Sequence, residues 1–131
     1  MLRWLVEGGI RAFDTASIAE IELARRILPG AHCSYNHPVK SRAAIVAAYR
    51  EHGIRDFVVD HPAELDKLTA EIGTDIVVQV RVAASNPHAT ISFNSKFGAS
   101  PEQAITLLRA VCERGMTPAV STHIGYQTTD P

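Results

Sequence analysis

The sequence has little of what several classes of protein require. It contains two cysteines, Cys33 and Cys112, which are too few for a disulfide framework and form no Cys-x-x-Cys pair. We therefore expect both to be buried apolar thiols. No apolar run is long enough to span a bilayer, and the chain begins inside an amphipathic pattern rather than with a charged segment followed by an apolar one. The sequence thus predicts no membrane association and a cytoplasmic setting.

An excess of charge of either sign is also lacking. The 13 lysines and arginines nearly balance the 14 aspartates and glutamates, and the formal net charge is -1 at pH 7. This balance gives no electrostatic reason to expect nucleic acid or an anionic membrane surface as a partner, and a small or zwitterionic ligand fits better. With 131 residues, 46% of them hydrophobic and 21% charged, the chain has the size and composition of one globular domain over 1–131.

Three motifs of well-known sites are missing. Without Gly-x-Gly-x-x-Gly, a dinucleotide-binding sheet is disfavoured. Without Gly-x-Ser-x-Gly, there is no nucleophile elbow. The histidines and carboxylates also lack close ligand spacing such as His-x-x-x-His, so we expect no metal.

What the chain does contain is a regular alternation of short apolar runs and helical patterns. Strands are expected at 10–13, 31–35, 57–59, 76–82 and 118–123, and helices at 2–8, 18–27, 41–53, 62–73 and 100–115. Repeats of roughly 20 to 25 residues indicate a parallel α/β architecture. A five-stranded open sheet and part of an eightfold barrel both fit, and periodicity alone does not choose between them.

Two further expectations concern the helices and one long connection. Leu23 and Ile105 are expected to face the core together with their apolar helical neighbours. The segment 83–98 is expected to be a polar loop, and loops of this length are usually functional.

Polar residues stand at the carboxyl ends of the expected strands, where a parallel barrel keeps its chemistry. They are Asp14, Asn36 with His37, Asp60, Arg81 and His123. Asp14 and Asp60 also fit as caps of the helices that follow them, and the histidines as core residues. Arg81 is harder to explain structurally, because a buried guanidinium needs a partner.

Six segments, in this order and spacing, carry a resemblance to a known family. They read Phe13-Asp14-Thr15-Ala16-Ser17 with Glu20-Ile21-Glu22-Leu23, Tyr35-Asn36-His37-Pro38-Val39-Lys40, Val59-Asp60 with Glu64-Leu65, Val80-Arg81-Val82, Ser95-Lys96-Phe97-Gly98-Ala99, and His123-Ile124-Gly125 with Thr129-Asp130-Pro131. The sequence resembles the ornithine decarboxylase family, the pyridoxal-phosphate-dependent decarboxylases of basic amino acids that are built on an alanine-racemase-like barrel. The resemblance covers essentially the whole chain.

The resemblance implies a partial (β/α)8 TIM barrel of about five βα units. Residues 1–131 would form the central part of the barrel that binds pyridoxal phosphate. The family's Schiff-base lysine precedes this part, and its C-terminal β domain follows Pro131. We therefore expect both to be absent and the isolated chain to be inactive, and we do not expect Lys40, Lys67 or Lys96 to act as that lysine.

The resemblance also implies roles for individual residues. His123 matches the histidine that stacks on the cofactor ring, and Gly125 matches the glycine that follows it. Asp14 and Glu20 match acidic residues near the Schiff-base lysine, and Arg81 matches an arginine close to the cofactor. The implied catalytic residues are Asp14, Glu20 and His123, and the implied cofactor-binding residues are Asp14, Arg81, His123, Gly125 and Tyr126.

The resemblance further implies decarboxylation of ornithine to putrescine, a step of polyamine biosynthesis, or of lysine. A homodimer is implied by Lys96, which lies in the loop that reaches the partner subunit in the family. Tyr126 stands where the family usually has a serine that helps to hold the cofactor phosphate, and it favours an alternative, a catalytically silent homologue that binds a regulatory partner. A racemase on the same barrel is a second alternative.

Overall fold

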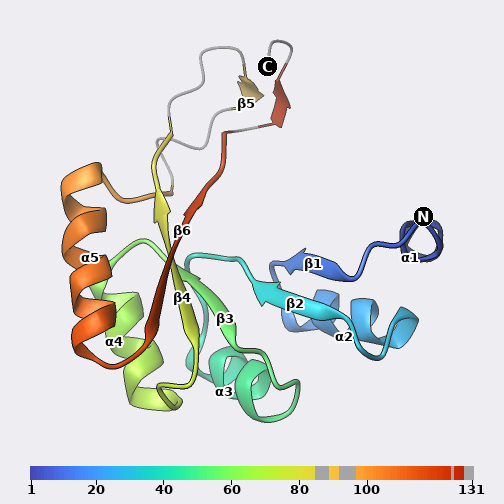
Figure 1. Cartoon of the computed structure of the whole chain (residues 1–131), viewed down its shortest axis with the longest axis horizontal. Coiled ribbons are helices and arrows are strands. Elements are labelled where there is room, and N and C mark those ends of the chain that lie inside the picture. The colour runs from blue at the N-terminus through green and yellow to red at the C-terminus, as the bar shows by residue number, and fades with distance from the viewer. Residues whose placement is uncertain (85–88, 92–96, 125, 129–131) are drawn as a thin grey trace.

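The computed structural model of the chain describes residues 1–84, 89–91, 97–124 and 126–128. Strands and helices alternate along it as the sequence predicts (Figure 1). The elements are α1 (Leu2–Glu7), β1 (Ala12–Thr15), α2 (Ile18–Ile27), β2 (His32–Tyr35), α3 (Arg42–Arg50), β3 (Asp56–Val59), α4 (Pro62–Glu71), β4 (Val77–Val82), β5 (Ala89–Ile91), α5 (Pro101–Glu113), β6 (Thr117–Thr122) and β7 (Tyr126–Thr128).

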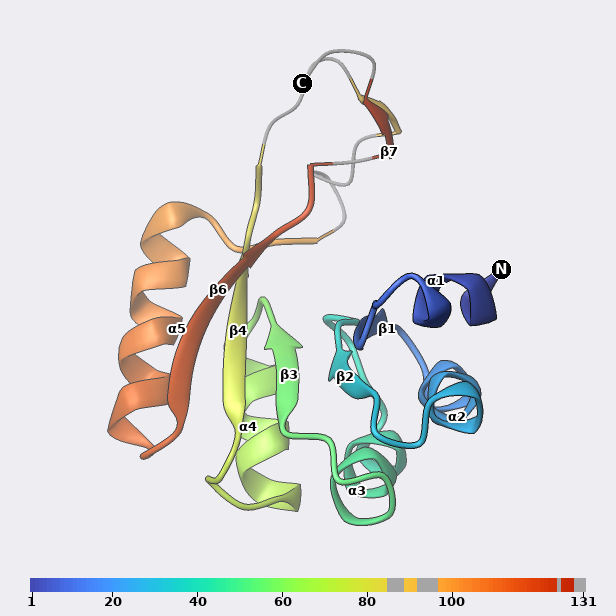
Figure 2. The same ribbon diagram turned by 45° about the vertical axis from the view of Figure 1, so that its right-hand side comes forward.

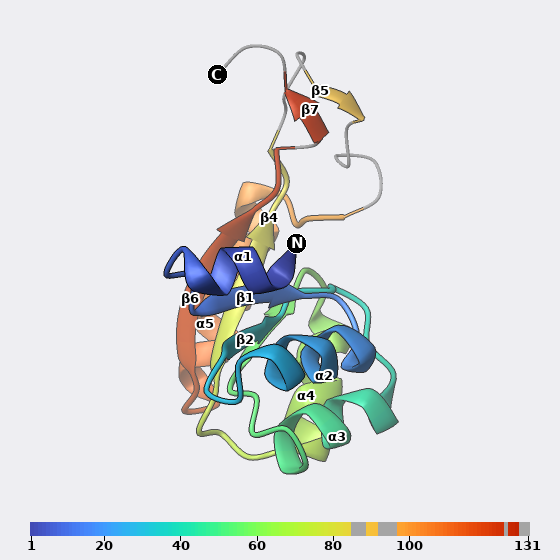
Figure 3. The ribbon, with the colours of Figure 1, turned by 90° about the vertical axis from the view of Figure 1, so that its right-hand side faces the viewer.

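The main sheet is parallel, and its strand order β1-β2-β3-β4-β6 follows the order of the chain. In a doubly wound sheet the order reverses at a switch point, whereas a barrel adds each strand beside the one before it. Contacts between α2 and α3 and between α3 and α4 place these helices on the same side of the sheet (Figures 2 and 3). This winding is that of a partial barrel and settles the choice that periodicity left open.

A second, smaller sheet lies beyond the carboxyl ends of β4 and β6 (Figure 1). It consists of β5 and β7, which pair antiparallel at Ala89 with Thr128 and at Ile91 with Tyr126. The sequence predicts only a loop for 83–98, so β5 is a structural element that the apolar pattern did not reveal.

The helix starts are capped by other residues than the strand-end aspartates. The Ser17 hydroxyl accepts a hydrogen bond from the Glu20 amide at 3.3 Å and caps α2. The His61 Nδ1 accepts one from the Ala63 amide at 3.2 Å and caps α4. The capping roles considered for Asp14 and Asp60 are therefore wrong, and both carboxylates are left for other contacts.

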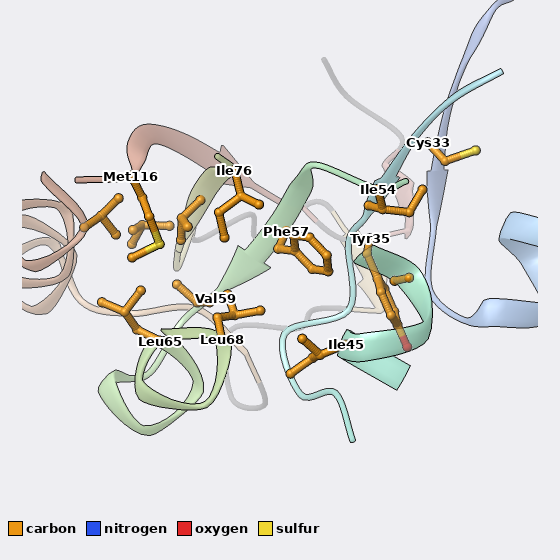
Figure 4. Close-up of a cluster of buried hydrophobic side chains, with 14 of the residues drawn as sticks. Cys33, Tyr35, Ile45, Ile54, Phe57, Val59, Leu65, Leu68, Ile76 and Met116 are labelled. Atoms are coloured by element: carbon orange, nitrogen blue, oxygen red, sulfur yellow. The ribbon is translucent and has the colours of Figure 1, made fainter. Parts of the chain in front are cut away.

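The core lies between the sheet and its covering helices (Figure 4). Phe57 and Val59 of β3 pack with Ile45 of α3 and with Leu65 and Leu68 of α4 in one buried cluster. All five side chains are almost completely removed from solvent, which is the main stabilising contribution of this layer.

Three burial predictions fail for a shared geometric reason. Leu23 and Ile105 are 43% and 51% exposed, and Cys112 is exposed, whereas Cys33 is buried as predicted. Successive helical residues are rotated by about 100°, so Leu23 points away from the α2 face that buries Ile21. Ile105 and Cys112 likewise share a side of α5 that the described elements leave open.

None of the helices in the described part of the chain has both the length and the apolarity needed to cross a membrane. The main sheet has two edges, because β1 and β6 each pair with one neighbour within it.

Candidate active site

A cavity of about 370 Å³ lies at the carboxyl ends of the main strands. Four of the predicted site residues line it together, although they are far apart in the sequence. These are Asp14, Glu20, Arg81 and His123. The remaining walls include Asn36, His37 and Pro38 from the connection after β2, and Phe97. The predicted site residues in the described part of β1, α2, β4 and the end of β6 thus meet at one mouth.

Strand alternation explains why Arg81 stands in a strand otherwise rich in valine. Val80 is fully buried on the helix-covered side of β4, so its neighbour Arg81 points to the opposite side. Parallel register places Arg81 opposite Ser121, two residues before His123. The valines therefore hold β4 in the core while the arginine is directed to the cavity.

Arg81 has the partner that a buried guanidinium needs. The side chain is 8% exposed, and its Nη2 donates to the Asn36 backbone oxygen at 3.0 Å and to Asn36 Oδ1 at 2.7 Å. Burial lowers the pKa of Arg81, and the nearby carboxylates of Asp60 and Asp14 oppose this shift. Its buried Nε has no partner among the described residues, which leaves one donor for a ligand that carries an acceptor.

The acidic side of the cavity is fixed by backbone amides. Glu20 Oε2 accepts a hydrogen bond from the Ala16 amide at 2.6 Å, which holds this carboxylate in the first turn of α2. Asp60 Oδ2 accepts one from the Gly98 amide at 2.9 Å and so ties the segment next to Phe97 to the end of β3. Glu20 is thereby held in the cavity wall. Asp60 does not line the cavity, but its hydrogen bond with Gly98 helps to position the neighbouring wall residue Phe97.

His37 is a cavity residue to which the sequence analysis gave no specific role. Its Nδ1 accepts a hydrogen bond from the Val39 amide at 3.1 Å, which fixes the orientation of the ring. The ring also meets the edge of Phe97, with centroids 5.8 Å apart and planes at 73°. The available signal was the polar pair Asn36-His37 at a strand end.

The remaining predictions concern three lysines, Gly125 and Tyr126, and the structure describes only some of these residues. Lys40 and Lys67 contact Glu64 and are not among the residues that line the cavity. Gly125 and Lys96 lie outside the described residues. Tyr126 is described only as backbone of β7.

The groups present fit a planar cofactor with both acceptor and cationic groups better than a metal ion. The cavity offers a guanidinium with an unused Nε donor, two imidazoles and two carboxylates, which suit an aromatic ring that carries polar substituents. Over the described ranges, no group of three or more histidine, cysteine, aspartate or glutamate side chains is arranged to hold a metal.

Comparison with known proteins gives a consistent result. The sequence pattern of the family described as pyridoxal-dependent decarboxylase, pyridoxal binding domain, matches residues 1–131. A lysine/ornithine decarboxylase of Selenomonas ruminantium is 34% identical over 119 residues, which cover 88% of this chain and 30% of that protein. An ornithine decarboxylase of Panagrellus redivivus is 32% identical over 133 residues, covering 100% of this chain and 30% of that protein.

A solved structure shows the same arrangement of elements. The lysine/ornithine decarboxylase of Vibrio vulnificus, complexed with cadaverine, superposes with a TM-score of 0.75 at 34% sequence identity. The match covers 97% of this chain and 32% of that chain. This chain therefore spans about 30% of the length of the curated relatives named above.

Proposed function

Because the chain belongs to the family of pyridoxal-binding domains of pyridoxal-dependent decarboxylases, we propose that its cavity takes part in decarboxylation of a basic amino acid. The cofactor of this family is pyridoxal phosphate. We propose ornithine as the substrate, with putrescine as the product that enters polyamine biosynthesis, and lysine as the second choice. One observation carries the proposal: Asp14, Glu20, Arg81 and His123 line a single cavity at the strand ends.

The cofactor, when bound, supplies the electron sink that decarboxylation requires. The residues of this chain bind and orient it. Arg81 keeps a buried Nε donor that has no partner among the described residues and that would donate to an acceptor of the cofactor, and its Nη2 is already held by Asn36. His123 supplies an imidazole that would restrain the flat ring from one side. Restraint of this kind would keep the bound cofactor in one orientation, which lowers the entropic cost of the reaction.

The two carboxylates act on charge. Asp14 and Glu20 line the same cavity as the cationic Arg81, and they stabilise a protonated nitrogen brought near them. A basic amino acid carries a cationic nitrogen of this kind. Glu20 is held in place by the Ala16 amide, so it needs little rearrangement when a ligand enters.

We assign residues 1–131 to the central part of the barrel. In this assignment the Schiff-base lysine and the C-terminal β domain come from sequence outside these residues, and the chain alone is inactive. The two sheet edges at β1 and β6 would then pair with further barrel strands, so the isolated chain is expected to be marginally stable or to aggregate. A cytoplasmic homodimer completes the proposal.

The test is product analysis with the full-length protein. Ornithine labelled in its carboxyl carbon is supplied with pyridoxal phosphate, and labelled carbon dioxide and putrescine are measured. Release of both supports the proposal, and faster turnover of lysine would change the substrate but not the reaction. Retention of the label in an amino acid of inverted configuration would identify a racemase. Cofactor binding without any turnover would favour the silent homologue that Tyr126 suggests.

A further inference from the structure

Lys40 is the most deeply buried charged side chain among the described residues, and it lies directly behind the cavity wall. Its Nζ is within hydrogen-bond distance of four acceptors. These are the backbone oxygens of Val58 at 2.6 Å, His37 at 3.0 Å and Pro38 at 3.2 Å, and Glu64 Oε1 at 3.1 Å. An ammonium group has three hydrogens, so this set uses its whole donor capacity.

The backbone of Lys40 is held as well. Its amide donates to Glu64 Oε1 at 3.0 Å, and its carbonyl accepts a hydrogen bond from Lys67 Nζ. Lys67 Nζ also pairs with Glu64 Oε2 at 2.7 Å. We call Lys40, Glu64 and Lys67 the Lys40 cluster. It joins the connection after β2 to β3 and to α4.

The connection held in this way forms part of the cavity. Its residues Asn36, His37 and Pro38 all line the cavity, and Lys40 bonds to the carbonyls of the last two. Asn36 in turn accepts both hydrogen bonds from Arg81 Nη2. A continuous set of contacts therefore runs from Lys40 through the connection to Asn36 and Arg81.

Stability alone is a weak explanation for this arrangement. Removing an ammonium from water is costly, and well-packed apolar residues often serve a core as well as a buried ion pair does. An ammonium does what an apolar group does not: it draws three separate carbonyl oxygens toward one point. That geometric effect is of use where the loop must be held in one position.

We propose that Lys40 is a positioning residue of the cofactor site, which fixes residues 36–40 so that Asn36 holds Arg81 in the cavity wall. The inference rests on the proposed function, because it assigns Arg81 to cofactor binding. Lys40 itself does not line the cavity and takes no direct part in the chemistry.

Because Lys40 is charged, the proposal also predicts how the affinity for the cofactor depends on pH. Burial lowers the pKa of Lys40 to about 8, although the charge and hydrogen bond of Glu64 act in the opposite direction. The other groups that face it are Lys67 of α4, Asp60 after β3, and the Tyr35 ring of β2, whose centroid is 5.9 Å from Nζ. Above about pH 8 the ammonium loses a proton and one donor, and the loop loses part of its restraint.

The experiment measures pyridoxal phosphate affinity of the full-length apoprotein by titration, for the wild type, Lys40→Met, Arg81→Met and the double variant. Methionine keeps the length of the lysine side chain but has no donor. We expect Lys40→Met to weaken binding by about tenfold, the size of effect that goes with loss of charged hydrogen bonds. Because Lys40 acts through Arg81, the double variant should bind about as weakly as Arg81→Met alone.

If the loss of affinity in the double variant equals the product of the two single losses, the residues act independently and the proposal is overturned. Unchanged affinity in Lys40→Met would overturn it as well. Arg42→Met is the matched control, since this neighbouring cation is 61% exposed and pairs with Glu71 on the outside of the helices. Its affinity should equal that of the wild type. The wild type should also lose affinity above about pH 8 relative to Lys40→Met, and parallel pH profiles would contradict the inference.

A replacement variant and a crystal structure test the inference if the first experiment fails. If Lys40→Met does not fold, Glu64→Gln takes its place in the same cycle, because it removes the charge partner but keeps an acceptor. If the wild type does not bind the cofactor, the proposed function fails. The positioning role is then judged from a crystal structure of Lys40→Met, in which the hydrogen bond between Arg81 Nη2 and Asn36 Oδ1 should be lost. Its survival would overturn the inference.

Discussion

The Lys40 cluster and a second group of polar and charged residues connect neighbouring βα units at opposite ends of the strands. The second group, which we call the Asp75 cluster, consists of Tyr49, Arg55 and Asp75, next to the amino ends of β3 and β4. Asp75 accepts hydrogen bonds from the Tyr49 hydroxyl and, at 2.9 Å, from Arg55 Nε. The Arg55 guanidinium also lies 4.0 Å from the Tyr49 ring centroid.

The two clusters use similar interactions in opposite surroundings. The side chains of Arg55 and Asp75 are 42% and 60% exposed, whereas those of Lys40 and Glu64 are 0% and 7% exposed. Water and salt screen the exposed charges, while the buried charges depend on their partners. Both ion pairs are well formed, but only the buried pair of the Lys40 cluster lies next to the cavity. We therefore expect only this pair to affect cofactor binding.

The largest effect should come from removing one partner of the buried pair. Glu64→Ala leaves the ammonium of Lys40 without its carboxylate, which we expect to destabilise the full-length protein by about 3 to 5 kcal/mol. Urea unfolding measures this change. A double variant with methionine at positions 40 and 64 should recover most of the loss, because it removes both charges. An unchanged unfolding midpoint in Glu64→Ala would show that the pair is not coupled to folding.

The next effect concerns pH. The folded pKa of Lys40 is about 8, below the ordinary lysine value of 10.5. Between these two values the unfolded chain binds more protons than the folded one, so this group adds stability as pH rises, by at most about 1.4 kcal/mol per pH unit. Unfolding measured from pH 7 to 10.5 should show this slope in the wild type relative to Lys40→Met. Equal slopes would mean that Lys40 is not desolvated.

At acid pH the protonation of Glu64 should dominate the effect of the pair on the free energy of unfolding. Burial acts to raise the pKa of Glu64, but hydrogen bonds and charge from Lys67 and Lys40 outweigh it, and the pKa lies below the ordinary value of 4.5. Its contribution is therefore complete above that value and is lost as pH falls through the lower folded pKa. Acid unfolding of Glu64→Gln should lack this component, and an identical acid profile would contradict the assignment.

Arg81→Met should change the free energy of cofactor binding by less than Glu64→Ala changes the free energy of unfolding, but its effect on function is direct. Loss of the charged donors should weaken pyridoxal phosphate binding by roughly 30-fold, or about 2 kcal/mol. Absorbance titration of the full-length protein measures it. Arg50→Met is the control, because Arg50 is an exposed arginine in the last turn of α3. Equal affinity of the two variants would remove Arg81 from the site.

The smallest effect should follow from Asp75→Asn. The hydrogen bond from Tyr49 and the charge of Arg55 lower the pKa of Asp75, but the cluster is exposed to solvent. We expect a change in unfolding midpoint within the scatter of replicates, and no change in cofactor affinity. Titration at low and high salt checks both. A loss of affinity as large as that of Lys40→Met would remove the contrast between the two ends.

The elements were largely predictable because each has its own local signal. The helix expected at 18–27 is found with the same bounds, since Ser17 caps its start and Pro29 follows its end. Periodicity alone did not predict the strand order, because it reports which face is buried and not which neighbour a strand takes, whereas the family resemblance implied the barrel order that is found. Leu23 and Ile105 were misplaced because an apolar helical residue says nothing about whether a neighbour covers it.

The site was partly predictable for a related reason. Polar residues at strand ends indicated Asp14, Arg81 and His123, and the barrel winding brings them together. The role of Lys40 was hidden, because its contacts with Val58 and Glu64 lie 18 and 24 residues away along the chain. A charged residue two positions after a proline and just before a serine resembles an ordinary helix start. Its burial depends on tertiary packing, which no local pattern encodes.

The most direct test of the central claim is a crystal structure of the full-length protein with pyridoxal phosphate. We predict that the cofactor ring lies in the cavity, with the His123 imidazole against one face and Arg81 within hydrogen-bond distance of a cofactor atom. A cofactor bound elsewhere, with Asp14, Arg81 and His123 out of contact with it, would contradict the claim.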